Sequence, residues 1–244
     1  ANVLDSLELP PSSRIAVQVE KSVESLLLYL AVLRAGHVYL PLNVAYKSDE
    51  IAYFLGDAEP AVFVCQPKDF AWASRLAFAR GTKHVFTLGD DRSGSLLERA
   101  THFADTHAPA ERNADDLAAI LYTSGTTGRS KGAMLTHGNL AANAVTLKSY
   151  WGWKSADDGS GDVLIHALPI FHVHGLFVAS HGALLYGSAL VAERHAAFGA
   201  FALTHHDVID PAVLDIVRRA GNHSAVDFAR DLATLSSLRA QVAR

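Results

Sequence analysis

Short apolar runs alternate with stretches of helical periodicity along most of this chain, and that alternation limits its fold more than any other feature. The expected strands span residues 14–19, 61–65, 84–88, 117–122, 132–136, 163–167 and 188–192. The expected helices span residues 22–35, 48–55, 69–80, 95–103, 139–151 and 174–186. Strands that alternate with helices in this way favour a largely parallel sheet with helices on both faces. We therefore predict an α/β fold.

Residues typical of helix ends mark where the first two helices begin and end. Gly36 follows the first expected helix, and Gly56 follows the second, at positions where a left-handed residue commonly ends a helix. Ser48 is expected to cap the start of the second helix. Near the carboxyl terminus, residues 210–221 and 225–243 also show helical periodicity.

A segment rich in glycine and hydroxyl residues, residues 122–132 (YTSGTTGRSKG), follows the apolar run at 117–121. In parallel α/β sheets, ligands gather at the carboxyl ends of the strands, where this segment is expected to lie. Glycines let backbone N–H groups close around an anion, hydroxyls donate to phosphate oxygens, and a lysine adds positive charge. The candidate phosphate-binding residues are Thr123, Ser124, Gly125, Thr126, Thr127, Gly128 and Lys131. We call residues 123–131 the phosphate segment.

The glycine spacing of the phosphate segment differs from that of a P-loop. Gly125 and Gly128 are three residues apart, and Gly132 stands where a P-loop has serine or threonine after its lysine. This spacing disfavours a P-loop kinase. A surface turn without function is the plainer alternative for such a cluster, but the preceding strand and the lysine favour an anion-binding role.

Composition excludes several other classes of protein. Half of the residues are hydrophobic and 19% are charged, which favours a packed core over disorder. The net charge is −4 without a basic block, so nucleic acid and anionic membranes are not expected as main partners. No apolar run is long enough for a membrane span. The single cysteine, Cys65, excludes an internal disulfide, fits a cytoplasmic location and is expected to act as a small buried hydrophobe.

The phosphate segment resembles the signature of the AMP-forming adenylating enzymes, the family of acyl-CoA synthetases, peptide-synthetase adenylation domains and luciferases. Two other segments resemble motifs of the same family, residues 33–42 (LRAGHVYLPL) and residues 167–176 (ALPIFHVHGL). Within the family, the sequence of these segments is most similar to that of malonyl-CoA synthetases. The similarity runs from about residue 14 to about residue 190. We therefore expect residues 1–192 to form part of the family's large N-terminal domain and residues 193–244 to form a helical tail.

The resemblance implies a ligase that works in two steps. A malonate-like carboxylate attacks the α-phosphate of ATP with Mg²⁺ present, which releases pyrophosphate and gives an acyl-adenylate. Coenzyme A then displaces AMP from the acyl-adenylate to form a thioester. The phosphate segment would hold the β- and γ-phosphates, and one of its hydroxyls would contact Mg²⁺. His172 matches the family histidine beside the acyl carboxylate, so it is the candidate catalytic residue. His174 is expected to be structural, and His137 is expected to cap or brace the helix that follows the segment.

Three motifs of the family are absent: Tyr-Gly-x-Thr-Glu, Tyr-x-Thr-Gly-Asp and the C-terminal segment with the adenylation lysine. In addition, residue 1 is alanine and the only methionine is Met134. We expect the chain to be an N-terminal portion of an acyl-CoA synthetase, as a fragment, a rearranged gene product or a degenerate relative. The alternative is a non-catalytic nucleotide-binding or interaction module derived from such a ligase.

Overall fold

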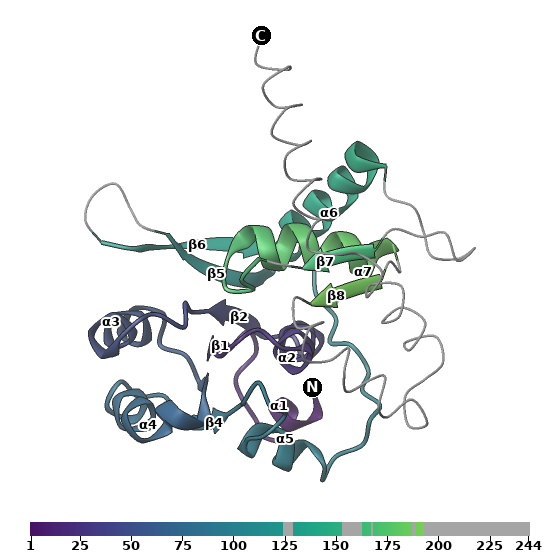
Figure 1. Ribbon diagram of the computed structural model, residues 1–244. Coiled ribbons are helices and arrows are strands. Elements are labelled where there is room, and N and C mark those ends of the chain that lie inside the picture. The colour runs from purple at the N-terminus through teal and green to yellow at the C-terminus, as the bar shows by residue number, and fades with distance from the viewer. Residues whose placement is uncertain (124–128, 153–162, 167, 187–188, 193–244) are drawn as a thin grey trace, which may run out of the picture. The chain divides into compact units, whose positions relative to one another are not determined.

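The computed structural model describes residues 1–123, 129–152, 163–166, 168–186 and 189–192 (Figure 1). The chain divides into two compact units, which are described separately. The first unit comprises residues 1–153 and 168–186, and the second comprises residues 154–167 and 187–244. The helices expected at 210–221 and 225–243 lie outside the described residues.

A six-stranded sheet forms the centre of the first unit. Its strands, in spatial order, are β4 (His84–Thr87), β3 (Val62–Cys65), β1 (Arg14–Gln18), β2 (Val38–Pro41), β5 (Leu117–Thr123) and β6 (Lys131–Thr136). All neighbouring strands are parallel except β5 and β6, which form an antiparallel hairpin. The predicted α/β fold with a largely parallel sheet is confirmed, and the hairpin is an addition to the prediction.

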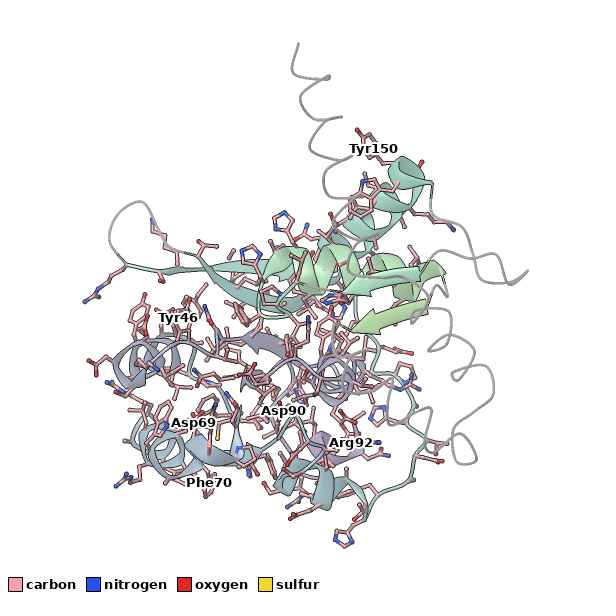
Figure 2. The ribbon with its side chains drawn as sticks, viewed as in Figure 1. Tyr46, Asp69, Phe70, Asp90, Arg92 and Tyr150 are labelled. Carbon is pink, nitrogen blue, oxygen red and sulfur yellow. The ribbon has the colours of Figure 1, made fainter. Side chains whose placement is uncertain are left out.

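Helices cover both faces of this sheet (Figure 1). Their bounds are α1 (Asn2–Asp5), α2 (Val23–Arg34), α3 (Ser48–Ala58), α4 (Phe70–Ala79), α5 (Ser95–Ala100) and α6 (His137–Trp151), with a short 3₁₀ turn, η1 (Pro67–Asp69), before α4. One hydrophobic core lies between the sheet and α2, and a second lies between the sheet and the pair α3 and α4. Side chains from the strands and helices fill both layers (Figure 2).

Strand β5 contributes to both cores because successive side chains in a strand point to opposite faces. Ala119 and Leu121 belong to the core on the α2 side, whereas Ile120 and Tyr122 pack into the core on the α3 side. Tyr122 is the last of these side chains before the phosphate segment. Its ring therefore faces α3.

The ends of α2 follow the sequence prediction. Helix α3 begins at Ser48, as expected, but Lys47 and not Ser48 is at the cap position, and the carboxyl end also differs. Ser22 caps α2 through a hydrogen bond from the Ser25 N–H, and Gly36 adopts a φ of 72° just after the helix. Helix α3 was expected to end before Gly56, but it continues to Ala58 and ends at Glu59, which adopts a φ of 43°. Phe54, Leu55 and Ala58 are buried against the sheet, and this packing outweighs the roughly 1 kcal/mol that a glycine costs inside a helix.

The segment expected as one helix at 174–186 has two parts. A π-helix, η2 (His174–Ser180), leads into α7 (His181–Tyr186). The Ser180 hydroxyl donates a hydrogen bond to the carbonyl oxygen of Gly175, five residues earlier. Within the second unit, β7 (Val163–His166) and β8 (Ala189–Ala192) pair as a parallel two-stranded sheet.

Candidate functional site

The two ends of the phosphate segment lie opposite each other at the end of the β5–β6 hairpin. Thr123, the last residue of β5, pairs in register with Lys131, the first residue of β6. Residues 124–128 lie outside the described part of the chain, so the roles predicted for Ser124, Gly125, Thr126, Thr127 and Gly128 stay predictions. Strand β5 runs parallel to β2. Thr123 therefore lies at the carboxyl edge of the sheet, as expected from the sequence.

Lys131 has a side chain that is available to an anion. The residue is exposed, and it forms no ion pair with any residue that the structure describes. Arg129, two residues earlier, is also exposed. When no carboxylate neutralises the ammonium group of a lysine, that group can attract an anionic ligand. The charge and the exposed Thr123 are thus presented together at one edge of the sheet.

Gly132 has a different role from the one predicted for the glycines of this region. It lies in β6 opposite Tyr122. A Cβ atom at this position would lie 2.8 Å from Cγ2 of Ile120 and 3.5 Å from the Tyr122 ring, and the first distance is too short for non-bonded carbon atoms. The glycine therefore makes room for side chains of the neighbouring strand.

The candidate catalytic histidine, His172, lies in the turn that precedes η2. The rings of His172 and His174 are both exposed and stack with centroids 5.4 Å apart and an interplanar angle of 15°. The Lys21 ammonium group donates to the carbonyl oxygen of Leu168 at 3.3 Å. Because Lys21 follows the carboxyl end of β1, this bond holds the segment that carries His172 at the carboxyl edge. The catalytic role of His172 and the structural role of His174 stay predictions.

His137 does not cap α6, although the sequence suggested that it caps or braces this helix. Thr136 is the cap: its hydroxyl accepts from the Asn139 N–H, and its own N–H donates to the Asn139 side chain. His137 is the first residue of the helix, and its Nε2 is buried without a hydrogen-bond partner among the described residues. Burial lowers the pKa of His137, so the imidazole is held in its neutral form.

Cys65 lies on β3 and is fully buried, as predicted for a small hydrophobe. Burial raises the pKa of its thiol to about 12. A thiol with that pKa has almost no thiolate at neutral pH and is a poor nucleophile. Cys65 therefore belongs to the core and not to a reactive site.

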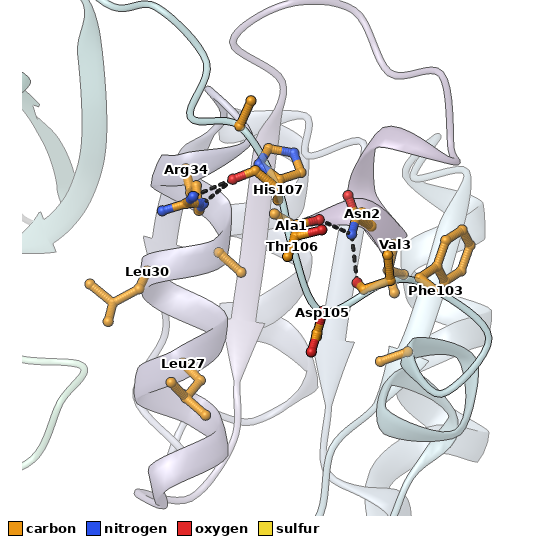
Figure 3. Close-up of a pocket in the computed structure, with 14 residues that line it drawn as sticks. Ala1, Asn2, Val3, Leu27, Leu30, Arg34, Phe103, Asp105, Thr106 and His107 are labelled. Atoms are coloured by element: carbon orange, nitrogen blue, oxygen red, sulfur yellow. Dashed lines mark hydrogen bonds between the residues drawn. The ribbon is translucent and has the colours of Figure 1, made fainter.

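A cavity of about 850 Å³ lies along α2 (Figure 3), and none of its lining residues belongs to β5 or β6. Its walls come from α1, α2, Ala100 and residues 103–108. Two polar side chains on these walls are already engaged: Asn2 donates to the carbonyl oxygens of Ala104 and Thr106, and Arg34 donates to that of His107. Arg34 ends α2 just before β2 begins, so this end of the cavity lies towards the amino edge of the sheet.

Two further kinds of feature do not occur among the described residues. They include no group of three or more His, Cys, Asp or Glu side chains placed to hold a metal ion. None of the helices in that part of the chain is long and apolar enough to cross a membrane.

Comparison with known proteins identifies the family. Residues 1–240 match the family described as AMP-binding enzyme. ATP-bound MatB from Rhodopseudomonas palustris aligns with a TM-score of 0.74 and 49% identity, over 83% of this chain and 40% of that chain. The sheet and its helices thus match the N-terminal domain of adenylate-forming enzymes. The chain belongs to the AMP-binding, adenylate-forming ligase family.

Two plant relatives point to the same family. The probable CoA ligase CCL9 of Humulus lupulus is 32% identical over 190 residues, which are 76% of this chain and 35% of that protein. The malonate–CoA ligase of Arabidopsis thaliana is 31% identical over 180 residues, which are 73% of this chain and 29% of that protein. The chain therefore spans only about a third of the length of these curated relatives.

Proposed function

We propose that this chain provides the triphosphate-binding hairpin of an acid–thiol ligase that activates a malonate-like carboxylate with ATP and transfers it to coenzyme A. The observation that carries the proposal is the pairing of Thr123 with an exposed Lys131 that has no carboxylate partner among the described residues. The 49% identity to ATP-bound MatB and the similarity to a malonate–CoA ligase support it.

The chemistry of the first step explains why such a hairpin is useful. An anionic carboxylate must approach an anionic triphosphate, and the repulsion between them opposes the reaction. In the proposed mechanism, the ammonium group of Lys131 and the hydroxyl of Thr123 bind the β- and γ-phosphates and lower that repulsion. Mg²⁺ would enter with the nucleotide; it commonly binds through phosphates and water, so it requires few protein ligands. His172 would donate a hydrogen bond near the reacting carboxylate.

Titration of the chain with Mg·ATP in a calorimeter tests the hairpin directly. Lys131→Ala is expected to weaken binding by about 1.5–3 kcal/mol, the range for one charge-assisted contact. Lys83→Ala is the matched control, because Lys83 is also exposed but lies just before β4, at the opposite edge of the sheet. Equal affinity of Lys131→Ala and the unaltered chain would refute the assignment of the hairpin.

A second measurement separates the ligase from a non-catalytic nucleotide-binding module. The chain spans only about a third of its relatives, so we expect Mg·ATP binding with little pyrophosphate release when malonate and coenzyme A are added. Robust release would show that the chain is a complete ligase by itself. Nucleotide binding without release, restored when the remainder of a relative is supplied, would support a ligase portion; no restoration would favour the module.

A further inference from the structure

Two hydrogen bonds attach the hairpin to α3, one next to Thr123 and one next to Lys131. The Tyr53 hydroxyl donates to the carbonyl oxygen of Ser130 at 2.8 Å. The Tyr122 hydroxyl donates to the carboxylate of Asp57. Ser130 directly precedes Lys131, and Tyr122 directly precedes Thr123. The contacts thus fall next to both described ends of the segment.

The two groups on α3 are one helical turn apart. Tyr53 and Asp57 are related as i and i+4, a spacing that places both on one face of a helix. Phe54 lies beside them, and the centroids of the Phe54 and Tyr122 rings are 4.5 Å apart. Tyr53 contacts Tyr122 edge-on, with ring centroids 6.2 Å apart. A rigid helix and packed aromatic rings therefore set the positions of both hydrogen bonds.

The chemistry of the Tyr122 contact keeps it in place at neutral pH. Burial and the hydrogen bond to Asp57 raise the pKa of Tyr122, so the phenol stays protonated and can donate. A hydrogen bond to a carboxylate is stronger than one between neutral groups. The absence of a Cβ atom at Gly132, described above, leaves room for the Tyr122 ring to lie against the hairpin.

We propose that Tyr53 and Asp57 are positioning residues, which hold Thr123 and Lys131 where both can contact one triphosphate. The inference rests on the proposed function. Among the described strands, β6 is the last of the sheet and pairs only with β5, so within this part of the chain strand pairing supports the hairpin from one side. Several modest donors must reach one ligand together, and a small displacement of their supports weakens all of them.

The test removes each hydroxyl and leaves its ring. Tyr53→Phe and Tyr122→Phe retain the aromatic packing but lose the hydrogen bonds. Tyr46→Phe is the matched control, because the Tyr46 ring (labelled in Figure 2) also packs on Phe54, with centroids 4.9 Å apart. Its hydroxyl donates no hydrogen bond to the described part of the hairpin. Amide hydrogen exchange of residues 129–136 and the affinity for Mg·ATP are measured for each chain.

The inference predicts faster amide exchange in β6 and an affinity for Mg·ATP that is about two- to tenfold lower in Tyr53→Phe and Tyr122→Phe, with no change in Tyr46→Phe. Unchanged exchange would show that the contacts do not support the hairpin. Faster exchange with unchanged affinity would refute the positioning role and leave the proposed function intact. An unaltered chain that binds no Mg·ATP would refute the proposed function, and the positioning role with it.

Two more variants separate positioning from general loss of structure. Asp57→Asn keeps an acceptor for the Tyr122 hydroxyl, so it should retain more affinity than Asp57→Ala. Tyr53→Phe should lower the affinity for Mg·ATP less in a Lys131→Ala background, because the charge that Tyr53 is proposed to position is already absent there. Equal effects of Asn and Ala at position 57, together with full additivity at Tyr53 and Lys131, would indicate a structural role only.

Discussion

Strands β3 and β6 belong to one sheet but differ in burial and in strand pairing. All four residues of β3 are buried, and the strand lies between two parallel neighbours. The first four residues of β6 are exposed, and its one partner among the strands that the structure describes is the antiparallel β5. Strands buried on both faces require apolar residues throughout, whereas an edge strand is free to carry polar ones. In this sheet, inner strands provide the stable core and the edge hairpin presents the groups proposed to bind nucleotide.

Removal of a large side chain from β3 should have the largest effect on stability. Phe63 is fully buried in the core beside α3 and α4. Phe63→Ala is expected to lower the free energy of unfolding by about 3–5 kcal/mol, because it leaves a cavity as well as losing burial. Urea unfolding measures the change. Phe78→Ala on α4 is the control, since Phe78 is 56% exposed; a similar loss at both positions would contradict the division between core and surface.

Acid should lower the free energy of unfolding through protonation of His181, which contacts the buried Tyr29. Its Nε2 lies 2.6 Å from the hydroxyl of the buried Tyr29, which packs on Tyr39 of β2. Burial lowers the pKa of His181 from 6.5 to about 4. The unfolded chain therefore binds more protons between these values, and the free energy of unfolding should fall as pH drops from about 6.5 to 4, by up to about 3 kcal/mol.

Comparison of the unaltered chain with His181→Asn isolates this contribution. Burial also lowers the pKa of His37 and His137, and both histidines are present in the two chains, so their contributions cancel in the difference. Urea unfolding at several pH values should show a steeper loss of stability in the unaltered chain. Parallel curves would mean that His181 titrates normally in the folded state.

A methyl group at Gly132 should have an intermediate effect on the hairpin. Gly132→Ala places a Cβ atom 2.8 Å from Cγ2 of Ile120, and such overpacking commonly costs about 1–3 kcal/mol. The same variant should also bind Mg·ATP more weakly, because the Tyr122 ring lies next to the new methyl group. Ala133→Ser, at an exposed position of the same strand, should change neither quantity. If Gly132→Ala is fully tolerated, the close approach does not exist in solution.

Truncation of an exposed residue on β6 should have the smallest effect. Met134 is 70% exposed. Met134→Ala is expected to change the free energy of unfolding by less than about 0.5 kcal/mol, as is usual for surface positions. A loss close to that of Phe63→Ala would show that this side of β6 is covered in the folded chain, and the contrast between the two strands would then be wrong.

Local features of the sequence were sufficient to predict most strands and several helix ends. Apolar runs identified β1, β3, β4 and β5 to within one or two residues, and Gly36 marked the end of α2 because a positive φ is required there. The phosphate segment, whose proposed role stays a prediction, could also be suggested from local sequence because its residues are consecutive. These features depend on side chains close together in sequence, so they can be predicted from short stretches of the chain.

Features that depend on distant residues were not predicted. The antiparallel pairing of β5 and β6 was missed because an apolar run does not indicate whether its partner strand is parallel or antiparallel. The continuation of α3 past Gly56 depends on burial of Phe54 and Ala58 against the sheet. Tyr53 and Asp57 carry no local signal of function, because their partners are 77 and 65 residues away in sequence.

The same sequence separations have a consequence for the order of events in a nascent chain. The amino-terminal residues leave the ribosome first, and structure that depends on them can form before later segments are made. Helix α3 and strands β1 to β3 therefore leave the ribosome before β5 and β6 do. The hairpin would then close onto α3 only after both of its strands are made, so the nucleotide binding proposed for it would arise late in synthesis.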